Sequence, residues 1–181
     1  AVVVDAVRTP VGKRGGQLRH WHPVDLLAHT LTHLAGRTGL DPNRLSDVIV
    51  GCALQRGEQS GNVARNALLG AGLPIALPGT TLDRQCGSGQ QAIHFAAQAI
   101  KSGEYDFAIG AGVESMSRAP WVLPKTEKPY PAGDLTLAST TLGWRMVNPA
   151  MPRQWTVSLG ESTEILAERS EVDRASQDEF A

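Results

Sequence analysis

Residues 80–93, with the sequence TTLDRQCGSGQQAI, decide how the rest of the chain is interpreted. They are typical of a short buried strand, a tight turn and then a helix over about residues 88–101. Lys101 in the last turn and Gly103 just beyond it are the end expected of such a helix. Cys86 therefore lies immediately before a helix N-terminus. The expected apolar positions of the helix are Ile93, Ala96, Ala97 and Ile100.

The position of Cys86 favours a nucleophile. Unpaired N–H groups and the helix dipole stabilise an anion at a helix N-terminus, and therefore a thiolate. Gly87 and Gly89 have no side chains, so a bulky acyl group could approach the sulfur. The alternative is a packing residue, because cysteines are often buried and inert. That alternative suits Cys52, which lies in the apolar run of residues 48–54.

Five segments, in order along the chain, resemble the thiolase family of acetyl-CoA acyltransferases. Residues 83–92 resemble the nucleophile segment of that family. Residues 8–13 resemble its opening strand and turn, residues 57–65 its dimer-interface segment, and residues 112–117 the strand end after the nucleophile helix. At residues 158–160 this chain has Ser-Leu-Gly, where many thiolases have His-Met-Gly or Ser-Met-Gly. The resemblance covers the whole chain.

The resemblance implies a thiolase-like N-terminal α/β domain, with a mixed, mostly parallel sheet and helices on both faces. Residues 1–117 would form the core that carries the nucleophile. Residues 118–181 would form an irregular covering loop region and the start of the helices that follow. The alternation of apolar strand and helix patterns independently favours a mostly parallel sheet with helices on both faces. Ligands of such sheets bind at the carboxyl ends of the strands, where Cys86 is expected.

The other elements of the core are expected from local patterns. Pro23 opens a helix with Asp25 in its first turn. The expected apolar positions of two helices are Leu27, Leu31 and Leu34 in the first, and Ala64, Ala67 and Leu68 in the second. In chain order, the pattern predicts a strand over residues 2–7 buried on both faces, the Pro23 helix, a strand over residues 47–54, a helix over residues 60–69 and a fully buried strand over residues 106–112.

Residues 118–157 are rich in proline and tryptophan, which excludes long regular elements. The tryptophans favour an ordered loop region, which in a thiolase-like protein covers the nucleotide and pantetheine arm of coenzyme A. Helices are expected from Ser158 through Ala167 and over residues 174–180. By resemblance, Ser158 lines the pantetheine path and Leu159 walls the acyl pocket. The alternative is that Ser158 is a plain N-cap.

The activity implied is transfer of an acyl group between a 3-ketoacyl-CoA and coenzyme A, through an acyl thioester on Cys86, as in fatty acid metabolism and β-oxidation. Coenzyme A is then a substrate, and no cofactor is implied. Homodimers or homotetramers are expected. Two alternatives stay open: a ketoacyl-synthase-like condensing enzyme, and a truncated half that binds coenzyme A or a partner protein without turnover.

The chain lacks groups that the thiolase reaction needs. A histidine base, a second cysteine and an oxyanion hole come, in that family, from the second half of the chain. His94 cannot replace the base, because eight residues of helix put it about 12 Å from Cys86 along the axis. We therefore expect that this chain is roughly the first half of a thiolase and that it is inactive, or nearly so, by itself. The missing initiator Met suggests that a few N-terminal residues are absent.

Composition excludes several classes of partner. Seventeen basic and eighteen acidic residues give a net charge of −1, which indicates neither nucleic acid nor an anionic membrane. No apolar run is long enough to span a membrane. Two cysteines, one needed as a thiolate, favour a reducing compartment, with the cytoplasm as default.

Two clusters of polar residues could suggest ligand binding but have a simpler interpretation. Asp25, His29 and His33, with His22 upstream, are expected to form the polar outer face of a helix and not a metal site. Lys13 and Arg14 are expected to lie in a solvated loop and not in a phosphate site.

Overall fold

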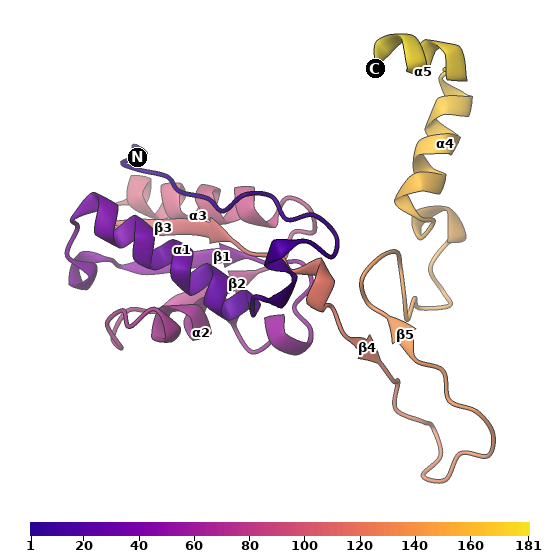
Figure 1. The fold of residues 1–181 in the computed structure, drawn as a ribbon, viewed down its shortest axis with the longest axis horizontal. Helices are drawn as coiled ribbons and strands as arrows, with labels where there is room; N and C mark the ends of the chain where they lie inside the picture. The colour runs from indigo at the N-terminus through magenta and orange to yellow at the C-terminus, as the bar shows by residue number, and fades with distance from the viewer. The chain divides into compact units, whose positions relative to one another are not determined.

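The computed structural model describes residues 1–181 and divides the chain into two compact units, residues 1–120 and residues 121–181 (Figure 1). The first unit is built on a parallel sheet in the order β2-β1-β3. Its central strand, β1 (Asp47–Gly51), pairs with β2 (Gly79–Leu82) on one side and with β3 (Ala108–Gly112) on the other. All three strands therefore end at the same edge of the sheet.

Helices cover both faces of this sheet (Figure 1). α1 (Pro23–Thr38) and α2 (Val63–Gly70) pack on one face, and α3 (Ser88–Ser102) packs on the other. Side chains alternate along β1, so Val48 and Val50 join the cluster with α1 and α2, whereas Ile49 packs with α3. The predicted α/β fold, with a parallel sheet between two helical layers, is confirmed.

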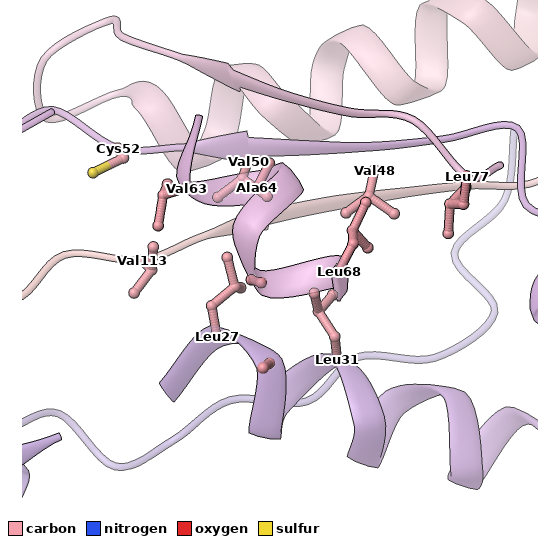
Figure 2. Close-up of a cluster of buried hydrophobic side chains, with 12 residues drawn as sticks. Leu27, Leu31, Val48, Val50, Cys52, Val63, Ala64, Leu68, Leu77 and Val113 are labelled. Atoms are coloured by element: carbon pink, nitrogen blue, oxygen red, sulfur yellow. The ribbon is translucent and has the colours of Figure 1, made fainter. Parts of the chain in front are cut away.

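The larger core cluster lies between β1 and the pair α1 and α2 (Figure 2). β1 is buried along its whole length, as expected for the central strand of a parallel sheet. The predicted apolar positions of α2 are all fully buried, and two of the three predicted for α1 are buried, with Leu34 only half-buried. The twelve buried members of the cluster are Leu27, Ala28, Leu31, Val48, Val50, Cys52, Val63, Ala64, Ala67, Leu68, Leu77 and Val113.

α3 approaches the sheet closely because two strand residues are glycines. A Cβ atom on Gly51 would lie 2.2 Å from the carbonyl carbon of Ser88, and one on Gly110 would lie 2.6 Å from the Cα of Ile93. Only small side chains fit between the layers, so Ala92 and Ala96 form the buried face of α3. The prediction that Ile93 faces the core was wrong: its side chain is 52% exposed, because there is no room for it under the helix.

Two strand predictions also need correction. Residues 2–7 do not form a strand, and the side chains of Val2, Val3 and Val4 are exposed. β-Branched residues favour extended backbone, but a strand also needs a hydrogen-bonded neighbour, and no sheet of this chain includes these residues. β3 begins at Ala108 and is only half-buried, because it is an edge strand.

The helix ends follow the expected capping rules. α1 begins at Pro23 with Asp25 in its first turn, and its C-cap is Gly39, whose φ is 62°. The C-cap of α3 is Gly103, whose φ is 80°. Short 3-10 helices complete the chain: η1 (Gln17–His20), η2 (Pro42–Arg44), η3 (Gly57–Gln59), η4 (Met116–Arg118) and η5 (Arg153–Trp155).

The second unit contains few regular elements, as its proline content predicts. β4 (Trp121–Val122) and β5 (Ala138–Ser139) form a short antiparallel pair. α4 (Leu159–Arg169) and α5 (Arg174–Phe180) follow, joined at Ser170–Asp173. The predicted helix positions are thus confirmed. The three tryptophans of this region are each more than half exposed, so they do not form a core within the unit: Trp121, Trp144 and Trp155. None of the helices in either unit has the length and apolarity to cross a membrane.

The close approach of α3 predicts that Gly51→Ala is strongly destabilising. The added methyl group meets backbone atoms that cannot rotate away, so we expect the free energy of unfolding in urea to fall by about 3 kcal/mol or more. Gly36→Ala in α1 is the matched control, because its Cβ atom would meet nothing within 4 Å. We expect it to stabilise the chain by about 0.5–1 kcal/mol. Equal stabilities of the two variants would contradict the packing described here.

Candidate active site

The turn between β2 and α3 has an unusual backbone at Gln85, just before Cys86. The φ angle of Gln85 is 49°, in the left-handed region that residues other than glycine rarely adopt. Such a conformation is maintained only where surrounding bonds fix it. Sequence analysis predicted a tight turn here but not this residue as its unusual position, since glycine is the usual occupant of such a position and the segment offers Gly87 instead.

Hydrogen bonds from neighbouring residues fix this turn. The Gln85 amide donates to Oδ1 of Asp83 at 2.7 Å. The hydroxyl of Ser88 donates to the Gln85 carbonyl at 2.5 Å and accepts from the Arg84 amide at 2.8 Å. The Ser88 side chain is buried, with 4% of its surface exposed. These bonds hold the backbone on both sides of Gln85, and sequence reasoning found neither side-chain contact.

Cys86 is exposed at the carboxyl edge of the sheet, immediately before α3. The edge is closed by bonds between the strand ends: the Cys52 amide donates to the Leu82 carbonyl, and the Val113 amide to the Gly51 carbonyl. The N-cap of α3 is Gly87, and no side chain caps this helix end. The Cys86 thiol is therefore accessible at a helix N-terminus, as predicted from the sequence. The arrangement can present a sulfur nucleophile to a substrate, with the helix dipole favouring negative charge.

The space around the thiol also fits the expectation. A Cβ atom added to Gly89 would meet nothing within 4 Å. Gly87 has only ordinary contacts, with the Arg84 carbonyl oxygen 3.4 Å from such an atom. The first turn of α3 is thus unobstructed within this unit.

Cys52 has the opposite environment. Its side chain is 1% exposed, and its sulfur lies 3.8 Å from Oε1 of Glu114. Burial, and then the nearby Glu114 carboxylate, raises the pKa of the Cys52 thiol from 9.0 to about 12. The interpretation of Cys52 as a packing residue fits this burial. A protonated, buried thiol is a poor nucleophile.

Glu114 joins the loops that follow β1 and β3. Its two carboxylate oxygens accept from the Ala53 amide at 2.8 Å and from the Leu54 amide at 3.0 Å. Buried Gln59 adds a second link, since its Oε1 accepts from the Ser115 amide at 2.6 Å and its Nε2 donates to the Leu54 carbonyl. Sequence analysis named both residues only as parts of segments that resemble a family. The bonds show that they shape the edge of the sheet where Cys86 lies.

Glu58 and Arg118 add an ion pair near this edge. Both guanidinium nitrogens that face Glu58 donate to its carboxylate, and this bonding lowers the pKa of the Glu58 carboxyl and raises the pKa of Arg118. Nε2 of His22 lies 3.8 Å from the same carboxylate. The segment expected to form a dimer interface, residues 57–65, thus also has a role within its own chain.

The remaining candidates lie away from the thiol or in the second unit. His94 is exposed on α3. His29 and His33 lie on α1, where their rings pack edge to face with centroids 4.6 Å apart. In the second unit, the hydroxyl of Ser158 accepts from the Glu161 amide at 3.1 Å and caps α4, so the N-cap alternative describes its contact within this chain. Leu159 follows it and is 77% exposed.

Comparison with known proteins identifies relatives along the whole chain. Residues 1–181 match the model of the family described as "Thiolase, N-terminal domain". A 3-oxoadipyl-CoA/3-oxo-5,6-dehydrosuberyl-CoA thiolase of Escherichia coli strain K12 is 47% identical over 183 residues, which is 100% of this chain and 45% of that protein. A β-ketoadipyl-CoA thiolase of Pseudomonas aeruginosa is 46% identical over 99% of this chain and 45% of its own length.

Two further relatives extend the comparison. A steroid 3-ketoacyl-CoA thiolase of Mycobacterium tuberculosis is 55% identical over 120 residues, 66% of this chain and 30% of that protein. The crystal structure of the Bacillus anthracis acetyl-CoA acetyltransferase has a TM-score of 0.80 at 35% identity, over 96% of this chain and 42% of that one. The chain thus spans about half the length of the relatives that it matches.

The two cysteines should differ sharply in reactivity. Treatment of the folded chain with iodoacetamide at about pH 7 should alkylate exposed Cys86 and leave buried Cys52 unmodified. Peptide mass spectrometry assigns each site, and unfolding in urea is the control, because it should make both thiols available. Modification of Cys52 as fast as Cys86 in the folded chain would contradict the assignment of roles.

The raised pKa of Cys52 predicts a loss of stability in alkali. The unfolded thiol ionises near pH 9.0, whereas the folded one keeps its proton until about pH 12. The contribution of Cys52 to stability is therefore complete below pH 9 and is lost as the pH rises towards 12. Urea unfolding between about pH 8 and about pH 11 should show a steeper decline for wild type than for Cys52→Ala. Parallel declines would contradict the assignment.

Proposed function

The chain belongs to the thiolase family, and we propose that Cys86 is the nucleophile of a thiolase that transfers acyl groups between 3-ketoacyl-CoA and coenzyme A. The observation that carries the proposal is the exposed Cys86 thiol, which lies at the carboxyl edge of the sheet directly before α3. The match of the whole chain to the thiolase N-terminal domain favours this activity over that of a condensing enzyme of the ketoacyl-synthase type.

The proposed reaction has two steps, both at the sulfur. In the degradative direction, the Cys86 thiolate attacks the 3-keto carbon of a 3-ketoacyl-CoA, and the bond between C2 and C3 breaks. The shortened acyl group stays on the sulfur as a thioester, and the departing acetyl-CoA carbanion takes up a proton. The thiol of coenzyme A then attacks the acyl thioester, its proton passes to the Cys86 sulfur or to a base, and a shorter acyl-CoA leaves.

The candidates for proton transfer named from the sequence do not lie beside Cys86. The other cysteine, Cys52, is buried with its sulfur 3.8 Å from Glu114, and His94 is exposed on α3. We infer that the base, the acid and the oxyanion donors come from segments outside these residues. The relatives named above are more than twice as long as the matched region, which leaves room for such segments.

The second unit is proposed to bind the substrate. Ser158 would line the path of the pantetheine arm and Leu159 would wall the acyl pocket, where a leucine gives an apolar, branched surface. The exposure of Leu159 supports contact with something outside its own helix. The names of two relatives specify a β-ketoadipyl-CoA thiolase and a steroid 3-ketoacyl-CoA thiolase. A β-keto acyl-CoA is a 3-ketoacyl-CoA, so this unit is the proposed substrate class. We propose assembly as a homodimer or homotetramer.

Cys86→Ala should abolish turnover by the full product of the gene that encodes these residues. The assay follows the decrease in ultraviolet absorbance as the 3-ketoacyl thioester reacts with coenzyme A. We expect the rate of this decrease to fall by a factor of about 10⁴ or more, because the variant cannot form the covalent intermediate. Intact-protein mass spectrometry of wild type should show one added acyl group. Cys52→Ala is the matched control and should keep both signals. Turnover that survives Cys86→Ala would refute the proposal.

A further inference from the structure

The hydroxyl of Ser88 is used in a way that helix capping does not explain. A serine at the N-cap bonds to amides of its own helix. Ser88 is instead the residue after the N-cap, Gly87, and its Oγ donates to the Gln85 carbonyl and accepts from the Arg84 amide, both upstream of α3. The side chain is 4% exposed, so these bonds are shielded from water. A buried hydroxyl with both its donor and acceptor sites on the turn holds that turn against the helix.

Asp83 holds the same turn from the other side. Its Oδ1 accepts from the Gln85 amide at 2.7 Å. Together, Asp83 and Ser88 bind the amide and the carbonyl of Gln85, whose φ is positive. Asp83 is exposed, so its side chain is free to be changed without opening the core.

We propose that Ser88 and Asp83 are positioning residues, which hold Gln85 in its left-handed conformation and thereby aim the Cys86 thiol at the start of α3. The backbone angles of Gln85 set the direction in which the next residue projects. If either bond is lost, Gln85 can relax to an ordinary conformation, and the sulfur moves away from the amides of the helix. The inference rests on the proposed function for its catalytic meaning, but the position of the thiol is measurable without turnover.

The first test compares Asp83→Ala with Asp83→Asn by the rate at which iodoacetamide alkylates Cys86. Both substitutions remove the same negative charge, but only asparagine keeps an oxygen that accepts from the Gln85 amide. We expect Asp83→Asn to react at least as fast as wild type, and Asp83→Ala to react about two- to fivefold more slowly than Asp83→Asn, the range of a charge at a helix terminus. Equal rates in the two variants would overturn the role of Asp83.

The second test uses Ser88→Ala, with Ser102→Ala as the matched control. Ser102 lies at the other end of α3 and also donates its hydroxyl to a carbonyl, that of Ala99 at 2.8 Å. We expect Cys86 to be alkylated about two- to fivefold more slowly in Ser88→Ala than in wild type, and at the wild-type rate in Ser102→Ala. An unchanged rate in a folded Ser88→Ala variant would overturn the role of Ser88. If that variant does not fold, as circular dichroism would show, the Asp83 pair decides the proposal.

These outcomes separate the inference from the proposed function. Altered alkylation in Asp83→Ala and Ser88→Ala, with no acyl group found on wild-type Cys86, supports the positioning role and refutes the thiolase assignment. Acylation of Cys86 in the full gene product, with alkylation unaffected by both substitutions, refutes the positioning role alone. Slower alkylation and slower acylation together support both.

Discussion

The approach of the first turn of α3 to the end of β1 is the constraint on which the candidate site depends. Gly51 permits it, since any side chain there would occupy the position of the Ser88 backbone. Gly110, on β3, permits a second close approach further along the helix, at Ile93. With two points of contact, the helix has one position on the sheet. Cys86, just before it, is thereby held at the carboxyl edge where the three strands end.

The same constraint explains where sequence reasoning about the fold succeeded and failed. The apolar faces of α1 and α2 were predicted because large side chains fill the space between those helices and the sheet. For α3, the predicted position Ala96 is buried, but the predicted Ile93 is exposed and its neighbour Ala92 takes the buried place. A pattern of hydrophobic residues does not report the distance between two layers, and here that distance selects alanine. The strand predicted over residues 2–7 was wrong for another reason. β-Propensity is a property of single residues, whereas a strand also needs a neighbouring strand with which to form hydrogen bonds.

The sequence predicts where Cys86 lies relative to the helix, but not the contacts that surround it. A cysteine followed by glycines before an amphipathic helix is enough to place Cys86, because capping rules are local. The partners that shape the turn are a different matter. The bonds of Asp83 and Ser88 to Gln85 need the actual backbone, and Glu114 reaches Ala53 and Leu54 across the sheet. No spacing in the sequence encodes such contacts.

The two cysteines show how completely environment decides chemistry. Cys52 follows the central strand and is surrounded by core side chains and the Glu114 carboxylate, which keep its proton on. Cys86 follows an outer strand and a turn that carries it out of the core. The side-chain bonds that hold this turn all come from within residues 83–88, so the unit can keep the Cys86 thiol in place without help from a distant segment.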